Sequence, residues 1–501
     1  MAGAPLTSQE KLVTAFTQGC VCGVTGPVAR IDTHLSHVFL TPERAFKLKR
    51  AVTFPFVDFS TLDKRRQACE AEIAVNRVMA GDLYIGVEPI VWRDGAFSLG
   101  GDGEVADWVV AMRRFRQEDQ FDQLAERGAL SRSCVEQAVD LVANAHAGTP
   151  STEHAGYPAQ YQGVINGLIQ TENDGAARLG IDPASPLLFD RLGNELTRIS
   201  GLINSRRRGG KVKHGHGDLH LRNLCVFEQR PIAFDALEFD ARLATGDVLY
   251  DLAFLLMDLR RAHLNEHANA AMNRYWDSAA EDEQALELLP FFMSLRAAVR
   301  MAVAVEAGDL KEALSYRTLG HELLGVNSAP LLVAIGGLSG TGKTAVAQAL
   351  APRLNGPAGA RILSSDVLRK RAAGLAREER APAASYAEER RAEVYSRLIA
   401  QAQKALDAGA DVVADATFQS LSPRQTIAGV SARLKAFWLT APDPVRLARV
   451  GQRTHDASDA DVNVAAAQTE PEKIAPPWVR IDADRPTGEV VADVVQRIGP
   501  H

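Results

Sequence analysis

Glycine, lysine and threonine at fixed spacing form the most specific chemical pattern in the sequence. Residues 337–344 read Gly-Leu-Ser-Gly-Thr-Gly-Lys-Thr, directly after an apolar run and directly before a helical pattern. Glycines let successive backbone N–H groups turn towards a polyphosphate, and the following helix adds its positive N-terminal end. The pattern therefore predicts an ATP site in which the lysine reaches the outer phosphates and the threonine hydroxyl binds Mg²⁺. The predicted nucleotide-binding residues are Gly337, Gly340, Gly342, Lys343 and Thr344, and Thr344 is also a predicted metal ligand.

Two aspartates follow later apolar runs. Asp366 comes directly after Arg-Ile-Leu-Ser-Ser, and Asp415 ends the run Asp-Val-Val-Ala-Asp. Parallel strands end at the sheet edge where ligands bind, so we predict Asp366 as the catalytic base for an attacking hydroxyl and Asp415 as a Mg²⁺ ligand. Arg369 is predicted to hold an anionic group of the acceptor. The alternative for each aspartate is a helix N-cap.

Three arginines share one face of a later predicted helix, because Arg446, Arg449 and Arg453 are spaced by three and four residues. A guanidinium group stabilises charge that is spread over several phosphate oxygens, so Arg449 or Arg453 is predicted to contact the transferring phosphate of ATP. The alternative is a solvated helix face on which the arginines pair with nearby carboxylates.

These residues make the segment from about Leu331 resemble the small P-loop kinases that include gluconate kinase, polynucleotide 5′-kinase and zeta toxins. The resemblance rests on the loop at 337–344 and on the Asp-x-x-Arg pair of Asp366 and Arg369, and it covers about 170 residues. In that group the aspartate acts as a base on an acceptor hydroxyl, and the resemblance implies this role for Asp366.

A second set of residues suited to phosphate transfer lies upstream. The segment from His214 to Asn223 reads His-Gly-His-Gly-Asp-Leu-His-Leu-Arg-Asn, and Asp235 ends an apolar run twelve residues later. Phosphoryl transfer needs a carboxylate at the acceptor hydroxyl and oxygen ligands that hold Mg²⁺. The spacing matches a kinase catalytic loop, so Asp218 is the predicted base, and Asn223 and Asp235 are the predicted Mg²⁺ ligands.

The histidines of this segment leave two alternatives open. His214, His216, Asp218 and His220 are similar to the His-x-His-x-Asp-His cluster of dinuclear metallohydrolases, although His220 is one position out of place. Metal ligation demands fixed spacing, which counts against this interpretation. The other alternative is a loop in which the histidines have only structural roles.

A lysine pair and an acidic helix are predicted to complete the upstream site. Lys47 and Lys49 lie on one face of a predicted strand because the side chains of a strand alternate. Lys47 is the predicted contact to the ATP phosphates, with Lys49 in reserve, and two lysines on a solvated strand face are the alternative. The next predicted helix carries Glu70 and Glu72, and we predict that Glu72 pairs with the lysine and so supports nucleotide binding.

With these residues the first half of the chain resembles the aminoglycoside phosphotransferase and choline kinase superfamily. The most specific pieces are residues 216–223, the run that ends at Asp235, and a helix start around Asp251. The resemblance implies the base role of Asp218, the metal roles of Asn223 and Asp235, and a buried structural role for Asp251. The order of the two halves resembles fused bacterial proteins described as aminoglycoside phosphotransferases with an ATP-binding domain.

The pattern of predicted elements divides the chain between residues 325 and 330. Strand-like runs at 37–40, 45–49, 84–92 and 108–115, and a helix at about 60–80, precede a mostly helical stretch. Strands first and helices afterwards predict an α+β, two-lobed domain over residues 1–325, which by the resemblance is protein-kinase-like. Strands that alternate with helices predict an α/β P-loop domain with a parallel sheet over residues 330–501.

Composition restricts the partners and the compartment. The 501 residues carry a formal net charge of −6, and affinity for nucleic acid rests on Lys and Arg, so a nucleic-acid partner is not expected. The five cysteines lack paired spacing for zinc or thiol chemistry, and we find no segment near the roughly 20 apolar residues that span a bilayer. We expect a cytoplasmic protein without a membrane anchor. The basic tract at 206–213 is expected to be a solvated loop, with binding of a phosphorylated or nucleic-acid acceptor as the alternative.

Together the patterns predict a bifunctional, ATP- and Mg²⁺-dependent phosphotransferase that acts on hydroxyl groups of a small molecule, such as a sugar, a polyol or an aminoglycoside-like compound. Three alternatives stay open: one active kinase half with the other half as an ATP-binding regulatory domain, transfer to nucleic-acid 5′-hydroxyls by the P-loop half, and aminoglycoside resistance. A further hypothesis is that the halves act in sequence on one metabolite, because fusion raises the local concentration of the first product.

Overall fold

The computed structural model describes residues 8–54, 57–179, 186–238, 241–325, 328–452 and 458–499. The chain packs as two compact units, one made of residues 1–157 and 203–255 and the other of residues 158–202 and 256–501. The helices between 256 and 325 therefore pack with the P-loop half, residues 330–501, although the predicted boundary places them in the first domain. That boundary stays a prediction.

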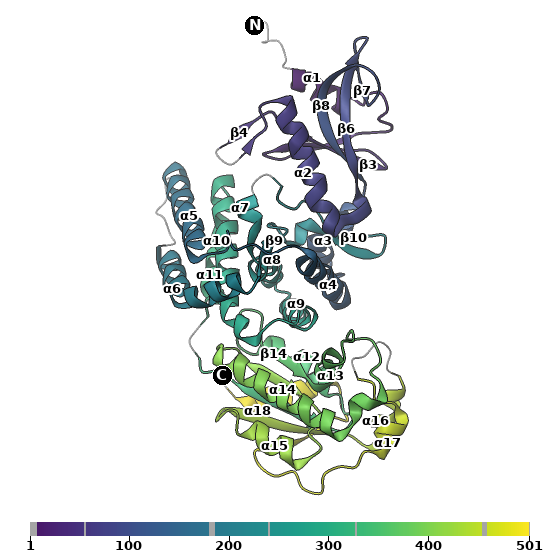
Figure 1. The fold of residues 1–501 in the computed structure, drawn as a ribbon, viewed down its shortest axis with the longest axis vertical. Helices are drawn as coiled ribbons and strands as arrows, with labels where there is room; N and C mark the ends of the chain where they lie inside the picture. Colours follow the sequence, from purple (N-terminus) through teal and green to yellow (C-terminus); the bar gives the residue numbers. More distant parts are fainter. Residues whose placement is uncertain are drawn as a thin grey trace. The chain divides into compact units, whose positions relative to one another are not determined.

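The first unit begins with a six-stranded antiparallel sheet of order β1-β2-β3-β8-β6-β7. Helix α2 lies beside this sheet in Figure 1, and it begins where the Thr61 side chain accepts a hydrogen bond from the Lys64 backbone N–H. The elements are α1 (Ser8–Thr17), β1 (Ala29–Asp32), β2 (Ser36–Leu40), β3 (Arg44–Lys49), β4 (Thr53–Phe54), β5 (Val57–Asp58), α2 (Leu62–Ala80), β6 (Tyr84–Arg93), β7 (Ala96–Leu99) and β8 (Glu104–Arg113).

Alternation along β3 gives the sheet two different faces. Phe46 and Leu48 are buried in an apolar cluster that includes Phe16 of α1. Lys47 and Lys49 point to the opposite face, where both contact a carboxylate of α2. Burial of each large apolar side chain contributes about 1.5–3 kcal/mol, so the core on one face fixes the positions of the two lysines on the other.

A hairpin in the rest of the first unit brings the predicted metal ligands to one place. Leu224 pairs with Ala233, and the Phe234 N–H donates to the Asn223 carbonyl O at 2.9 Å. This register puts Asn223 and Asp235 at the same end of the hairpin. The elements after β8 are α3 (Phe121–Glu126), α4 (Arg132–Gly148), β9 (Val212–His214), η3 (Leu221–Asn223), β10 (Leu224–Phe227), β11 (Arg230–Ala233), α7 (Ala241–Ala244), β12 (Thr245–Asp247) and α8 (Val248–Arg261).

Helix α10 is the buried centre of the helical part of the second unit. By length and composition alone, the stretch Glu283–Ala307 is apolar enough to cross a membrane, so the expectation that no segment approaches this length was wrong. Because 78% of its most apolar window is buried inside the protein, its burial is that of a core helix. The helices are α5 (Pro158–Leu179), α6 (Pro186–Arg208), α9 (Asn265–Ser278), η4 (Glu283–Leu288), α10 (Leu289–Ala307) and α11 (Leu310–Leu323).

The P-loop half folds as a five-stranded parallel sheet of order β14-β15-β13-β16-β17. Strand β13 is buried along its whole length and lies between β15 and β16, so the loop after it opens where the strand order reverses, which is where ligands bind to such sheets. The predicted succession of classes, an α+β half followed by an α/β P-loop half with a parallel sheet, is confirmed. The elements are β13 (Leu332–Gly337), α12 (Lys343–Leu350), η5 (Ala351–Arg353), β14 (Arg361–Ser364), α13 (Ser365–Ala372), η6 (Ala383–Tyr386), α14 (Glu388–Asp407), β15 (Val412–Asp415), α15 (Leu421–Ala428), β16 (Leu434–Thr440), α16 (Asp443–Gly451), α17 (Val462–Ala467), β17 (Trp478–Asp482) and α18 (Thr487–Ile498).

The basic tract at 206–213 is not a solvated loop. Arg206 lies in the last turn of α6 and is buried, and its Nε and Nη2 donate to the two carboxylate oxygens of Asp247 at 2.7 and 2.8 Å. Lys213 Nζ donates to the His146 carbonyl O at 2.5 Å. A buried guanidinium is costly unless it is paired, so Arg206 has a structural role and is not available to an acceptor.

Candidate active sites

Two glycines of the phosphate loop lie where a side chain would collide with neighbouring backbone. Gly340 has a φ of +86°, and a Cβ there would lie 2.4 Å from the Arg446 carbonyl O. Gly337 has a φ of +140°, and its Cβ would lie 2.6 Å from the Leu439 carbonyl O. Gly342, at φ +89°, is the N-cap of α12. The glycine positions of the loop therefore expose backbone without side chains in front of a helix N-terminus, which is the form that phosphate groups bind.

The loop threonine and the strand aspartate of the P-loop half meet. Thr344 Oγ1 donates to Asp415 Oδ2 at 2.8 Å, and Asp415 is buried at the end of β15. Lys343 Nζ donates to the Leu338 carbonyl O at 3.1 Å. Asp415 is not a helix cap, because the next helix has Ser420 as its N-cap. A hydroxyl and a carboxylate are oxygen ligands that Mg²⁺ accepts, so this pair fits the ion.

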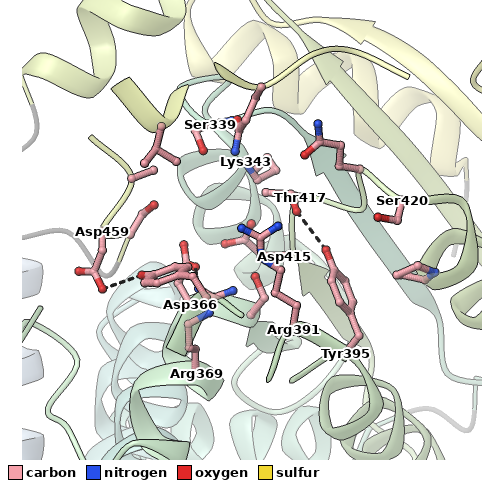
Figure 2. A pocket seen from close by; sticks show the side chains of 18 of the residues that line it. Ser339, Lys343, Asp366, Arg369, Arg391, Tyr395, Asp415, Thr417, Ser420 and Asp459 are labelled. Atoms are coloured by element: carbon pink, nitrogen blue, oxygen red, sulfur yellow. Dashed lines mark hydrogen bonds and ion pairs between the residues drawn. The ribbon is translucent and has the colours of Figure 1, made fainter. Parts of the chain in front are cut away.

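A cavity of about 1950 Å³ extends from the phosphate loop and is bordered by Asp366 and Arg369. These two residues belong to α13 and form an ion pair with each other. Figure 2 shows them on the same cavity as Lys343. The N-cap of α13 is Ser364, so Asp366 lies inside the first helical turn and not at the cap. The structure thus brings the predicted base and the nucleotide loop to one cavity.

The predicted arginines of α16 have different surroundings. Arg446 is buried, donates to the Ser339 carbonyl O at 2.9 Å and pairs with Asp443, so it holds the phosphate loop and does not face a ligand. Arg449 lines the cavity and donates to the Ala483 carbonyl O at 3.0 Å. Arg453 lies outside the described residues.

Two side chains of α14 line the cavity although no motif marks them. Arg391 and Tyr395 are four residues apart and therefore share one face of the helix, as Figure 2 shows. The Tyr395 hydroxyl lies 3.0 Å from Thr417 Oγ1 and accepts a hydrogen bond from the Phe418 N–H. Among the described acids, none forms an ion pair with Arg391. A spacing of four residues is common in helices, so the sequence did not single them out.

Asp459 fixes another wall of this cavity. Its Oδ2 accepts hydrogen bonds from the Tyr386 hydroxyl at 2.8 Å and from the Ala381 N–H at 2.9 Å, and Lys370 lies 3.0 Å away. Burial raises the pKa of Asp459, but these hydrogen bonds outweigh it and lower the pKa. The Tyr386 ring in turn lies 4.6 Å from the Arg369 guanidinium. By its hydrogen bond to Tyr386, Asp459 therefore orients the ring that contacts Arg369.

Two lysines share one buried carboxylate in the first unit. Lys47 Nζ lies 2.9 Å from Glu72 Oε1, and Lys49 Nζ lies 2.5 Å from Glu72 Oε2. Burial raises the pKa of Glu72, but the two ammonium groups outweigh it and lower the pKa to about 2. Glu70 forms an exposed pair on α2 instead. Lys49 is buried and also pairs with Glu238, so these lysines do not form a solvated strand face.

The predicted base and metal ligands of the first unit lie close to these lysines. Asn223 Nδ2 donates to Asp218 Oδ2 at 3.0 Å, and Asp235 Oδ1 accepts from Lys47 Nζ at 2.5 Å. Asp235 has a φ of +62°, and its N–H donates to the Tyr84 hydroxyl at 3.1 Å. This backbone conformation costs about 1–3 kcal/mol in a residue other than glycine and persists only where the surroundings impose it. Amide and carboxylate oxygens again fit Mg²⁺.

Asp251 holds the candidate catalytic loop through its backbone, in the buried role that the resemblance implies. Its carboxylate accepts hydrogen bonds from the His216 and Gly217 N–H groups at 2.8 Å each, and it lies 3.1 Å from His146 Nε2. His216 Nε2 lies 3.0 Å from the Phe234 carbonyl O, and burial lowers the pKa of this histidine. No group of three or more metal-binding side chains occurs in the described part of the chain, so the metallohydrolase alternative has no support.

A protein-family comparison finds a match within the second half. Residues 332–477 match the family model described as AAA domain. The matched segment contains the phosphate loop, α13, α14 and β15, which carry the candidate residues around the cavity. The match covers less than half of the chain and lies within the P-loop half.

Relatives of the chain come from mycobacteria. "Uncharacterized protein Rv2004c" of Mycobacterium tuberculosis (strain ATCC 25618 / H37Rv) and "Uncharacterized protein Mb2027c" of Mycobacterium bovis (strain ATCC BAA-935 / AF2122/97) are each 26% identical to it over 459 residues. The aligned part is 87% of this chain and 88% of each relative, so it includes residues of both halves.

Solved structures are similar to parts of the chain at low identity. A gluconokinase from Sinorhizobium meliloti 1021 is 19% identical, with a TM-score of 0.25, 34% of this chain covered and 93% of that chain covered. A choline/ethanolamine kinase family protein from Mesorhizobium loti is 13% identical, with a TM-score of 0.39, 64% of this chain covered and 96% of that chain covered.

The shared carboxylate of the first unit predicts a pH-dependent contribution to stability. Because the folded-state pKa of Glu72 is about 2 and the unfolded value is 4.5, its ionisation contributes about 3 kcal/mol at neutral pH. That contribution is lost as the pH falls from 4.5 towards 2. In urea unfolding, the free energy of unfolding of Glu72→Gln should therefore be much lower than that of the parent at pH 7. At pH 3.5 the difference between the two proteins should be smaller. The exposed Glu70→Gln is the matched control, and a loss that does not change with pH would contradict the assignment.

The glycine turn predicts a selective loss of nucleotide affinity. In Gly340→Ala the new Cβ must displace the Arg446 carbonyl, so calorimetry with Mg²⁺ and ATP should show affinity at the P-loop site reduced by about tenfold or more, or 1.4 kcal/mol. Lys47→Ala is introduced in parent and variant alike so that only this site is measured. Gly488→Ala is the control, because a Cβ there meets nothing within 4 Å. Equal affinity in Gly340→Ala and Gly488→Ala would refute the role of this turn.

Proposed function

We propose that the protein is a bifunctional, ATP- and Mg²⁺-dependent phosphotransferase that acts in the cytoplasm on hydroxyl groups of small molecules, with one site in each half. The observation that carries the proposal is the contact of Thr344 with Asp415 at 2.8 Å beside the side-chain-free turn at Gly340. The grouping of Lys47, Glu72 and Asp235 supports a second site in the first unit.

In the P-loop half, the loop backbone and Lys343 would hold the ATP phosphates, and Thr344 and Asp415 would hold Mg²⁺, which neutralises phosphate charge when bound. Asp366 would accept the proton of the acceptor hydroxyl while that oxygen bonds to the γ-phosphorus and the bond to the ADP oxygen breaks. Arg449, which lines the same cavity, is the proposed contact to the transferring phosphate.

In the first unit, Lys47 would hold the ATP phosphates, and Glu72 would keep its ammonium group in place. Asn223 and Asp235 would hold Mg²⁺, and Asp218 would take the proton of the second acceptor hydroxyl. Asn223 already orients Asp218 through a hydrogen bond of 3.0 Å. A base that is fixed before the acceptor arrives lowers the ordering cost of the reaction.

We further infer that the acceptor of the P-loop half carries a carboxylate or phosphate group. Arg369 was the residue predicted for this contact, but it is already paired with Asp366. Arg391 lines the same cavity and shares one face of α14 with Tyr395. No described acid forms an ion pair with it. A guanidinium matches the oxygen geometry of such an anion, so Arg391 is the better candidate, with Arg369 as its neighbour.

Paired variants test whether both halves are active. Sugars, polyols, sugar acids, aminoglycosides, nucleosides and 5′-hydroxyl oligonucleotides are screened for ATP-dependent phosphorylation by the parent, by Asp218→Asn and by Lys343→Ala. Each variant should lose one set of products by a factor of about 10² or more and keep the other, because removal of a catalytic base or a phosphate-binding lysine raises the barrier by several kcal/mol. If one variant keeps every product, its half is a nucleotide-binding regulatory domain. If only oligonucleotides are phosphorylated, the nucleic-acid alternative holds.

Arg391 predicts a change confined to the acceptor. In Arg391→Ala, the KM of the P-loop half for its acceptor should rise by about tenfold or more while the KM for ATP stays within about twofold, because a charge-assisted contact is worth about 1.5–3 kcal/mol. Arg391→Lys should recover part of the loss. The adjacent Arg390→Ala is the control, because Arg390 pairs with Glu393 and does not line the cavity. Equal KM values in the two alanine variants would rule out this contact.

A further inference from the structure

Strand β14, at one edge of the parallel sheet, is covered by side chains of helix α9 and not by another strand. Strand β14 pairs with β15 on one side only, so its other side presents unpaired backbone groups. On that side the Ile362 N–H donates to Asn273 Oδ1 at 2.7 Å, and Asn273 Nδ2 donates to the Ala360 carbonyl O at 3.2 Å. One asparagine of α9 thus makes two hydrogen bonds of the kind that a neighbouring strand would make.

A second asparagine one turn earlier extends this cover. Asn269 Nδ2 donates to the Ala358 carbonyl O at 2.8 Å and to the Ala360 carbonyl O at 2.9 Å. Asn269 and Asn273 are 2% and 6% exposed, so water does not compete for these bonds. Removal of a partner would leave a buried backbone group unsatisfied, which costs about 1–3 kcal/mol.

Arg361, the first residue of β14, forms hydrogen bonds and ion pairs with α9 and with η4, which follows α9 in the sequence. All the N–H groups of Arg361 have acceptors: Nε and Nη2 reach Glu283 of η4 at 2.9 and 3.2 Å, and Nη2 reaches Asp277 of α9 at 2.8 Å. Nη1 donates to Asn273 Oδ1 at 3.0 Å and to the Ile362 carbonyl O at 2.9 Å. Arg361 and Glu283 are each 1% exposed, and a buried pair of this kind tolerates little displacement.

This anchored strand leads directly into the acceptor side of the cavity. Strand β14 ends at Ser364, and α13, with Asp366 and Arg369, starts at the next residue. Helix α9 reaches past the strand as well. Asp277 lies 4.0 Å from Arg371 of α13, and Arg274 pairs at 2.7 Å with Glu378, just beyond α13. Contacts from α9 therefore lie before, on and after the helix that carries the candidate base.

We propose that α9 and η4, residues 265–288, are a working part of the P-loop kinase site, and that Asn273 and Arg361 are positioning residues that set the place of Asp366 and Arg369. The proposal rests on the proposed function for the role of Asp366. It assigns residues that precede the P-loop half in the sequence, and that pack in the same compact unit with it, to the acceptor geometry of that half. None of these residues touches ATP or the acceptor, and each acts through β14 and α13.

Hydrogen exchange of the full chain, read by mass spectrometry, tests the proposal without a known acceptor. In Asn273→Ala, amides in 360–372 should exchange about tenfold faster or more, the factor that corresponds to one lost buried hydrogen bond. Amides of the phosphate loop and α12, residues 338–350, should stay within about twofold of the parent, and so should the affinity for Mg²⁺ with ATP. Asn269→Ala is a second variant with the same expected direction. Glu266→Gln, on the exposed start of α9, is the control and should change nothing.

Faster exchange throughout 256–499, or no local change at 360–372, would overturn the proposal, because the asparagine would then contribute only to general stability or not at all. Where the screen yields an acceptor for the P-loop half, kcat with that compound should fall in Asn273→Ala while the KM for ATP is retained. An unchanged kcat would also overturn it. If no acceptor is found, the proposed function of the P-loop half fails. The exchange result still decides whether Asn273 positions residues 360–372.

Discussion

Charges that lie out of water must be matched by opposite charges, and this requirement organises both candidate sites. Glu72 is fully buried and is tolerable only because Lys47 and Lys49 both contact it, which fixes strand β3 relative to α2. Arg361 is equally buried and fixes β14 relative to η4 through Glu283. Breaking such a pair costs about 3–5 kcal/mol, because it leaves one charge without compensation. These ion pairs thereby hold β3 and β14, which lead to the candidate site residues, more tightly than apolar packing alone would.

The two halves gather their chemical groups by different geometries. In the P-loop half, parallel strands end at one edge, so the phosphate loop, Asp366 and Asp415 meet although long segments separate them in sequence. In the first unit an antiparallel hairpin brings Asn223 and Asp235 together, and Asp251 holds the preceding loop by two backbone N–H groups. Both arrangements bring a lysine and carboxylates into one site, and these are groups that the proposed phosphoryl transfer would use.

Residues with spacing dictated by chemistry could be predicted from the sequence, whereas residues with roles set by packing could not. The phosphate loop and the pair Asp218 and Asn223 are local patterns. The sequence did not separate Glu72 from Glu70; the structure does, because Glu72 lies on the buried face of α2 with Cys69, Ile73 and Asn76. Arg391 and Asn273 had no such pattern. Their roles depend on which helix faces a cavity or a strand edge, and an isolated arginine or asparagine in a helix does not carry that information.

The asparagine cover of β14 also bears on how the gene can change. A break in the coding sequence between residues 325 and 330 would release a polypeptide that still contains Arg361 but lacks Glu283, Asp277 and both asparagines. Its edge strand would present open backbone groups and an unmatched charge, which favours self-association in a crowded cell. Separation of the two halves into independent genes would thus need several compensating substitutions at once. Buried polar contacts of this kind therefore make it difficult to separate the two segments once they are part of one chain.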